Sequence, residues 1–335
     1  MQRSLLLALV LLLPLAAPAQ VGIREDEDAP ALAGRGVLSF TFENDMFAGT
    51  DRYYTSGHRL GWQSRGGAPA PLARAGGWLA PWLLPEEAPV EWGVSLAQSM
   101  YVSRHRIARR PPRDDRPYAG HLGLALSLHA ADERRFGVAE LSLGVVGPAA
   151  LAEQVQDLVH DAIDVEKLGG WDLQVSNRPV AMLSLERRVR LPRRLGPLEV
   201  DAVPALGANL GNLQTSAAGA LLLRIGQGLA MDFGPPRVRP ALSGLGVFRP
   251  PDGLAWYAYA GVEGRAIAYD ATLDGNRHDY WRVDHTPLVG ELSGGAVLAW
   301  GPLRFDASLV LRSRTFDEQS ATPHAFTATT LTFAF

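Results

Sequence analysis

The stretch FENDMFAGTDRYYTSGHRLGW, residues 42–62, places an amide, a carboxylate and a hydroxyl between two short apolar runs. Asn44 and Asp45 are adjacent, and Thr55 follows in the second run. Carboxylate and amide oxygens suit a hard cation, and an amide or hydroxyl can orient water or donate to an oxyanion. Taken alone, Asn44-Asp45 is more typical of a turn, and Thr55 of a strand residue that faces the interior.

A second group of candidate residues lies in the segment 148–177. Its apolar residues recur at helical spacing on one face, while His160 lies on another face, which predicts a short helix. A histidine can accept a proton from water near neutral pH, and Glu166 adds a carboxylate six residues later. Considered separately, both residues are more typical of solvated side chains.

Residues 102–117 form the third group, because this one segment is unusually rich in arginine. Guanidinium groups bind phosphate through two hydrogen bonds, so the segment indicates an anionic surface such as the phosphorylated outer leaflet of a Gram-negative envelope. Composition offers a simpler reading, since Lys167 is the one lysine among 32 basic residues. The arginines are Arg104, Arg106, Arg109, Arg110, Arg113 and Arg116.

The rest of the chain alternates apolar with small or polar residues, as the leucines of YAGHLGLALSLHA illustrate. This period of two predicts an all-β, antiparallel, up-and-down transmembrane β-barrel with one apolar and one polar face. The ending FTATTLTFAF fits a last barrel strand, and a soluble β-sandwich is the alternative. Twelve strands are predicted, near 36–43, 54–63, 90–101, 118–129, 135–147, 178–189, 197–209, 215–228, 255–268, 286–300, 302–315 and 324–335.

The N-terminus predicts export. Arg3, an apolar run and a small-residue exit at Ala19 are typical of a signal peptide over residues 1–19, which leaves 20–335 as one barrel domain. The chain has no cysteine, so no disulfide supports it. Its net charge of -3 gives no reason to expect nucleic acid. We therefore expect an integral outer-membrane protein whose partners include outer-membrane lipids and the barrel assembly machinery.

Strand parity brings the three polar segments together. In an up-and-down barrel the connections after strands 1, 3 and 5, here 44–53, 102–117 and 148–177, emerge on one side. Because external loops are the longer ones, this side is expected to be extracellular. A helix across the barrel mouth would then bring His160 toward the first loop. The segment 66–89, with Trp78 and Trp82, is expected to be a long turn near the membrane interface.

These motifs, together with DDRPYAG, GVVGPAALAEQVQDLVH and GGWDLQVSNRP, resemble the LpxR family of outer-membrane lipid A 3'-O-deacylases. The resemblance implies a twelve-stranded barrel that uses Ca²⁺ to remove an acyloxyacyl group from the 3'-position of lipid A, the anchor of lipopolysaccharide. Matching positions are Asn44, Asp45, Thr55, Glu166 and the general base His160. A cationic family residue, a lysine in the best-known member, has no lysine counterpart. Arg109 is its best substitute and Arg110 the next.

Ester hydrolysis needs an activated water, a stabilised oxyanion and a proton for the leaving alkoxide. His160 is the expected base, Asp45 and Glu166 are the expected calcium ligands, and Asn44 or Thr55 would orient water or bind the oxyanion. The chain has no Gly-x-Ser-x-Gly motif, which disfavours a serine hydrolase. Alternatives are a phospholipase or esterase acting on another lipid, and a non-enzymatic pore or receptor.

Overall fold

The structure is a computed structural model that describes residues 36–335, apart from Asp51, 80–82, Glu86, 239–246 and 275–279. The predicted signal peptide and Trp82 lie outside the described residues. Within that part of the chain, no helix has the length and apolar character that crossing a membrane requires.

The wall of the molecule consists of twelve long strands in the described residues. Each predicted strand is present, and its ends lie within three residues of the predicted ones. The strands are β1 (Gly36–Asn44), β2 (Tyr53–Ser64), β3 (Glu91–Val102), β4 (Ala119–Ala131), β5 (Arg135–Val146), β6 (Arg178–Val189), β8 (Leu198–Gly211), β9 (Gln214–Gln227), β10 (Leu254–Asp270), β11 (Leu288–Trp300), β12 (Leu303–Arg312) and β13 (His324–Ala334).

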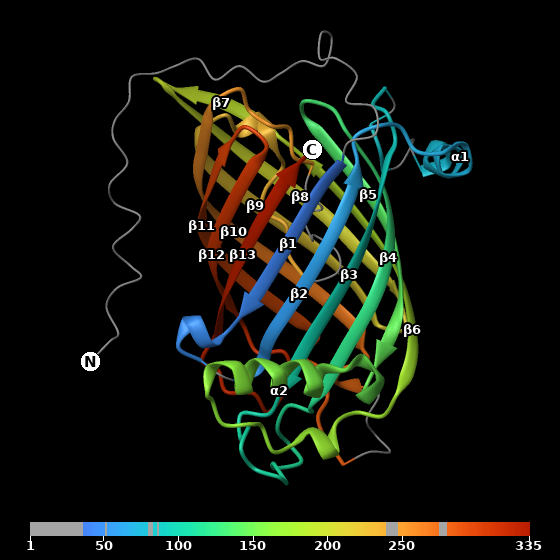
Figure 1. Cartoon of the computed structure of the whole chain (residues 1–335), viewed down its shortest axis with the longest axis vertical. Coiled ribbons are helices and arrows are strands. Elements are labelled where there is room, and N and C mark those ends of the chain that lie inside the picture. The colour runs from blue at the N-terminus through green and yellow to red at the C-terminus, as the bar shows by residue number, and fades with distance from the viewer. Residues whose placement is uncertain (1–35, 51, 80–82, 86, 239–246, 275–279) are drawn as a thin grey trace.

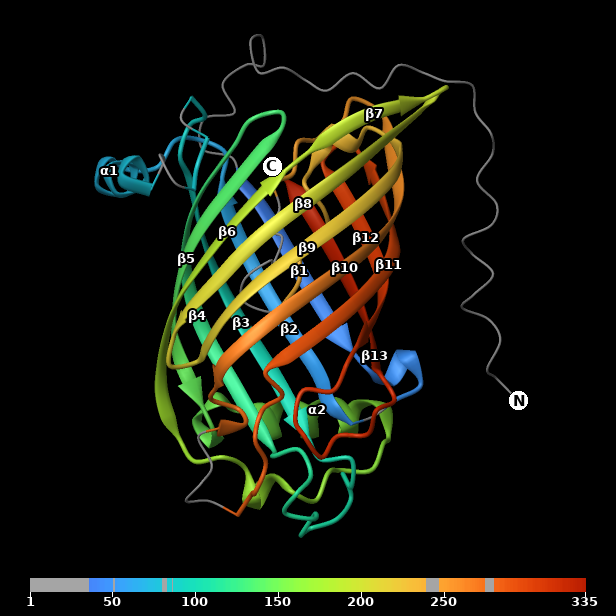
Figure 2. The ribbon, with the colours of Figure 1, turned by 180° about the vertical axis from the view of Figure 1, so that it is seen from behind.

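These strands close into a barrel (Figures 1 and 2). Each pairs antiparallel with its neighbours, β1 pairs with β13, and β6 pairs with β8. The short strand β7 (Leu191–Leu195) extends the β8 end as an exposed hairpin beyond the wall. The predicted twelve-stranded up-and-down barrel is therefore confirmed, with β7 as an addition that the sequence interpretation did not include.

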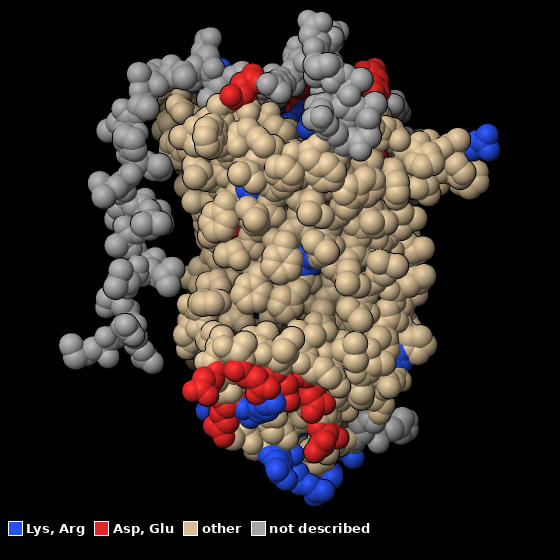
Figure 3. All heavy atoms as spheres, in the orientation of Figure 1, with Lys and Arg blue, Asp and Glu red and all other residues tan. Residues whose placement is uncertain are grey.

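The two faces of the wall differ as the alternation requires. Outward-facing Leu124 and Leu143 are 61% and 57% exposed, which suits contact with lipid. Inward-facing side chains include buried ion pairs, such as Arg224 with Asp201 at 2.6 Å and with Asp232 at 2.5 Å. Figure 3 shows a wall almost without charged atoms and charges gathered toward the two ends. The lumen is therefore lined by polar side chains that are joined by ion pairs.

The long polar connections gather at one end of the barrel, which we call the loop rim. The connections after β1, β3 and β5 all lie there, as strand parity predicts, and the third carries α2 (Ala152–Ile163) (Figure 1). The predicted helix is therefore confirmed. The opposite end, where β13 finishes, we call the terminal rim; its turns 132–134 and 301–302 are short.

The segment 66–89 is not simply a long turn, because it contains α1 (Ala70–Leu79) near the terminal rim (Figure 1). Pro71 lies in the first turn, where its missing N–H costs nothing, and alanine, leucine and arginine favour the helix. Gly76 has a packing role, since a Cβ there would lie 2.7 Å from Val90 Cγ1. Trp78 is 85% exposed on this helix.

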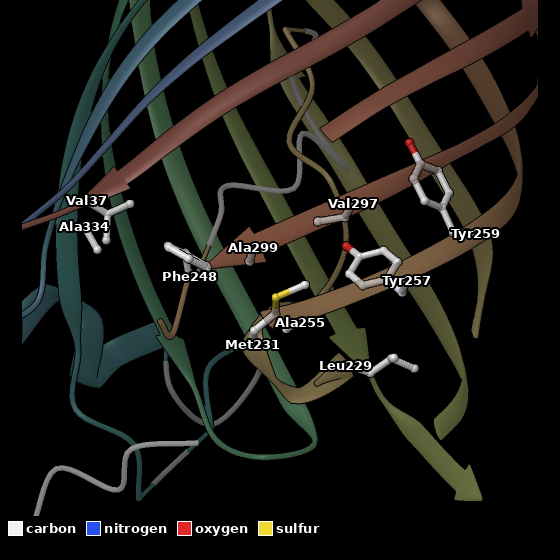
Figure 4. Packing of buried hydrophobic residues seen from close by; sticks show 10 residues of the cluster. All are labelled: Val37, Leu229, Met231, Phe248, Ala255, Tyr257, Tyr259, Val297, Ala299 and Ala334. Atoms are coloured by element: carbon white, nitrogen blue, oxygen red, sulfur yellow. The ribbon is translucent and has the colours of Figure 1, made fainter. Parts of the chain in front are cut away.

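A segment from the terminal rim enters the lumen. The luminal segment, described at 228–238 and 247–253, packs Met231 and Phe248 against inward-facing residues of β10 and β11 (Figure 4). Farther in, Arg237 Nε lies 2.5 Å from Glu43 Oε1 on β1. The lumen is thus filled at this level by the protein's own chain.

Candidate active site at the loop rim

Asp45 organises the connection between β1 and β2. It precedes η1 (Met46–Ala48), and its carboxylate accepts hydrogen bonds from the Arg52 N–H at 2.7 Å and the Thr50 hydroxyl at 3.4 Å. The side chain is fully buried. Burial raises the pKa of Asp45 to about 7, although the hydrogen bonds from Arg52 and Thr55 lower it. Asp45 therefore holds the loop from inside.

Thr55 meets Asp45 at an irregularity in β2. The pairing of β2 with β3 shifts between Tyr54 and Ser56, so Thr55 is the extra residue of a β-bulge. Its hydroxyl donates to Asp45 Oδ1 at 3.4 Å, and its carbonyl accepts from the Asp45 N–H at 3.2 Å. The structure thus brings these two predicted residues together, although both are buried.

Asn44 faces the opposite way from Asp45. It continues the outward-facing row of β1 after Phe40, which is 46% exposed, and stays partly exposed itself. Asn44 Oδ1 accepts a hydrogen bond from the Met46 N–H at 2.9 Å. Its Nδ2 group has no partner among the described residues. The adjacent Asn-Asp pair is therefore divided between the outer and inner sides of the wall.

The helix α2 lies on the outer wall and not across the barrel mouth. Gln98 and Gly120 belong to outward-facing rows of β3 and β4, and Gln98 Nε2 donates to the Ala150 carbonyl at 2.7 Å. A Cβ at Gly120 would lie 2.6 Å from Ala152 Cβ, so this glycine permits the close approach. The expected position across the mouth is wrong, because the small residues Ala150 and Ala152 let this segment pack closely on β3 and β4.

His160 lies in the last turn of α2. Its Nδ1 is 2.8 Å from the Glu166 backbone carbonyl, which can only accept a hydrogen bond. Nδ1 must therefore carry a proton, and in the neutral imidazole Nε2 has the free lone pair that a general base needs. His160 and Glu166 are thus brought together, but through the Glu166 main chain. No hydrogen bond or ion pair joins His160 to Asn44, Asp45 or Thr55 in the described residues.

Charged residues around α2 are partly paired. Lys167 Nζ lies 2.9 Å from Asp161 and 3.4 Å from Asp157, which ties the chain after the helix back to it. Acidic atoms curve around basic atoms at this rim in Figure 3. On other sides of the helix, Val159 and Ile163 are 45% and 47% exposed, which leaves an apolar surface beside His160.

The glycine-rich motif after α2 holds the loops together. Gly169 N–H donates to the Arg106 carbonyl at 2.9 Å, and a Cβ at Gly169 would lie 2.4 Å from the Ile107 oxygen. Trp171 Nε1 donates to Gln156 Oε1 at 3.0 Å, and its ring packs edge-on against Tyr118. The motif residues thus explain how the second and third loops form one unit.

The arginines of the second loop do not form a single exposed patch. Arg109 and Arg110 are exposed and make no ion pair within the described part of the chain. Arg116 is instead buried, where its Nη2 donates to the Thr272 hydroxyl at 2.8 Å and its guanidinium stacks on Tyr101. The predicted anionic surface can therefore include Arg109 and Arg110, but Arg116 is structural.

Three outward-facing polar residues went unnoticed in the sequence interpretation: Ser56, His58 and Gln98. Period-two alternation could have identified them, because they continue rows that hold Leu60, Trp62 and Leu96. They lie on β2 and β3 beside Asn44, which pairs directly with Ser56. A polar residue in a lipid-facing row is the signal that was available.

A solved structure shares this architecture. A structure of LpxR from Salmonella typhimurium matches with a TM-score of 0.73 and 21% identity, covering 89% of this chain and all of that chain (100%). The β domain of a Bordetella autotransporter matches with a TM-score of 0.43 and 16% identity, covering 90% of this chain and 99% of that one. No curated protein matches the chain. The family described as outer membrane protein LpxR matches residues 5–335. Because this match spans nearly the whole chain, the protein belongs to the LpxR family and is an integral β-barrel of the outer membrane.

Proposed function

We propose that this protein is a lipid A 3'-O-deacylase, which hydrolyses the 3'-linked acyloxyacyl ester in the outer leaflet of the outer membrane. Membership of the LpxR family implies this activity. One geometric observation carries the proposal for this chain. His160 lies on a helix that packs against the outer wall, and its Nδ1 is hydrogen-bonded to the Glu166 carbonyl, which leaves Nε2 available. A lipid in the membrane can reach that wall from the side, without entering the lumen.

The proposed reaction is direct hydrolysis. His160 Nε2 takes a proton from water as the water oxygen attacks the ester carbonyl carbon. The carbonyl oxygen becomes an oxyanion, to which the free Nδ2 group of Asn44 can donate. The bond from carbon to the sugar oxygen then breaks, and His160 returns the proton to that oxygen. The products are a sugar hydroxyl and a carboxylic acid.

Asp45 and Thr55 are proposed to position Asn44. Their hydrogen bond and the Arg52 contact fix the turn from within the wall, while Asn44 remains on the outer side. Arg109 and Arg110 are proposed to bind phosphate on the substrate, because they are exposed on the loop that packs against the motif following α2. Arginine cannot supply a proton here, so this role is electrostatic.

Calcium dependence is implied by the family resemblance, but the two predicted ligands, Asp45 and Glu166, do not form a calcium site by themselves. Among the described residues, no group of three or more acidic or histidine side chains could hold a metal ion. Asp45 is buried, and both of its carboxylate oxygens accept hydrogen bonds from its own loop and from Thr55. The Glu166 side chain is exposed in the segment after α2. Ca²⁺ takes six to eight oxygen ligands, so the predicted pair does not fit a protein-only site. We therefore assign no step to the ion; if Ca²⁺ binds here, main-chain carbonyls, water or substrate oxygens would supply the remaining ligands.

An esterase acting on phospholipid is the second candidate, because the same base and outer-wall location would serve it. A pore is disfavoured by the luminal segment, which fills the lumen with Met231, Phe248 and the Arg237–Glu43 pair.

Purified protein in detergent, incubated with lipid A or with phospholipid, distinguishes the two enzymes. Mass spectrometry should detect loss of the acyloxyacyl group from lipid A and intact phospholipid. Adding a chelator tests calcium separately, with loss and recovery of activity expected on removal and return of Ca²⁺. Cleavage of phospholipid with intact lipid A would overturn the proposed substrate.

A further inference from the structure

The lipid-facing rows of β1, β2 and β3 change character near the loop rim. Away from the rim they present large apolar side chains, such as Phe40, Leu60 and Leu96, which are between 46% and 49% exposed. Nearer the rim the same rows continue with His58, which is partly exposed, and with Ser56 and Gln98, which are only 8% and 9% exposed. We call these three residues the wall patch. An ionisable residue in a lipid-facing row is costly, and its presence indicates a function.

The register makes the wall patch continuous. Phe42 pairs with His58, and His58 pairs with Gln98, so these three residues lie side by side across β1, β2 and β3. The Phe42 ring stacks on the His58 ring with centroids 5.2 Å apart. Two residues nearer the rim on β1, Asn44 pairs with Ser56 of β2. The wall patch therefore adjoins the residue proposed to bind the oxyanion.

His58 has unused hydrogen-bonding capacity. Its Nε2 lies 3.5 Å from Ser56 Oγ, at the limit of a hydrogen bond, and Nδ1 has no partner within the described residues. Gln98 differs, because its Nε2 donates a hydrogen bond to the carbonyl of Ala150, the last residue of η2 (Pro148–Ala150). Of the wall patch, His58 is thus the side chain best able to bind a ligand.

We propose that the wall patch is the barrel side of the lipid A site, and that His58 hydrogen-bonds a carbonyl where an acyl chain joins the sugar. This inference rests on the proposed function. Ester and amide carbonyls of a membrane lipid lie just inside the polar boundary, at the edge of the apolar rows. The Phe42 ring, which stacks on the His58 ring, orients His58 for this contact. His58 determines substrate binding and takes no part in the proton transfer of His160.

Replacing His58 with phenylalanine separates binding from folding. His58→Phe matches the neighbouring apolar rows and keeps a ring against Phe42, so the free energy of unfolding should stay equal or rise. The apparent KM for lipid A in mixed micelles should rise roughly tenfold, the effect of one lost hydrogen bond, with a smaller change in kcat. Leu60→Phe, at the next outward position of β2, is the matched control and should leave both constants unchanged. His58→Asn, which keeps a donor, should recover part of the affinity.

Two results would overturn the proposal: an unchanged KM in His58→Phe, or a loss of barrel stability that accounts for the lost activity. Wild-type protein that releases no acyl group would instead contradict the proposed function. In that case, lipid A is titrated into the protein and its binding is followed by tryptophan fluorescence, which tests whether the wall patch binds lipid A. Affinity roughly tenfold weaker in His58→Phe supports it, and equal affinity overturns it.

Discussion

At the residue scale, the chemistry of His160 depends on a main-chain contact. The Glu166 carbonyl fixes the proton on Nδ1, so a replacement of the Glu166 side chain leaves this hydrogen bond available. The sequence identified both residues through their spacing and family resemblance. It could not reveal that the carbonyl, and not the carboxylate, makes the contact, because that depends on the turn in which Asp164 adopts a left-handed conformation.

His285 provides a pH-dependent test at this scale. Its Nδ1 lies 2.7 Å from Asp274 Oδ1 and its Nε2 3.1 Å from the Ile267 carbonyl, so both nitrogens face acceptors. Burial lowers the pKa of His285, but the hydrogen bond and charge of Asp274 outweigh it and raise the pKa above its usual value. The stabilisation is therefore complete below about pH 6.5 and lost as pH rises through the raised pKa.

NMR titration of His285 should give a midpoint above about 6.5, and Asp274→Asn should lower that midpoint. A midpoint at or below the ordinary histidine value in the wild-type protein would contradict the contact.

At the element scale, the docking of α2 onto the outer wall places His160. Gly120→Val should push the helix away, since its Cβ would lie 2.6 Å from Ala152 and 3.1 Å from Ala150. We expect deacylation to fall by roughly 100-fold, as misplacement of a catalytic group by about 1 Å can do, while the barrel stays folded. Proteolysis of residues 147–177 should become faster. Gly264→Val is the control, because a Cβ there meets no atom within 4 Å, and matching activity in the two variants would refute this packing role.

Sequence patterns predicted the strands well and the shorter elements unevenly. Period two identified all twelve wall strands, and parity placed the three loops at one rim. The helix α1 was missed because Gly76 and Gly77 weaken the local helical signal, and contact with Val90 compensates for one of them. The Thr55 bulge was also beyond prediction, since it is defined by pairing with β3. As a result, the opposite orientations of Asn44 and Asp45 became clear only in the structure.

At the scale of the whole molecule, the barrel is closed around its own luminal segment. The pair of Arg237 and Glu43 links that segment to the strand that carries Asn44. Arg237→Met removes the guanidinium that is hydrogen-bonded to buried Glu43 and should lower the free energy of unfolding by about 3–5 kcal/mol. The double variant Glu43→Gln/Arg237→Met should recover much of this loss. Urea unfolding in detergent measures both, and additive losses in the double variant would contradict a coupled pair.

The sequence did not predict this luminal segment, because residues 228–253 carry several prolines and glycines and little periodicity. Its position depends on contacts that are distant along the chain, such as Met231 with the β10–β11 wall. The lumen therefore distinguishes this protein from an open pore in a way that strand counting cannot.

The most direct test of the central claim is the mass of lipid A from Gram-negative cells that express this protein. Wild-type protein should produce lipid A that lacks the mass of one 3'-linked acyloxyacyl group. His160→Gln, which removes the base, should give a folded barrel at equal abundance and unmodified lipid A. Unmodified lipid A with the wild-type protein, or equal deacylation by His160→Gln, would contradict the account.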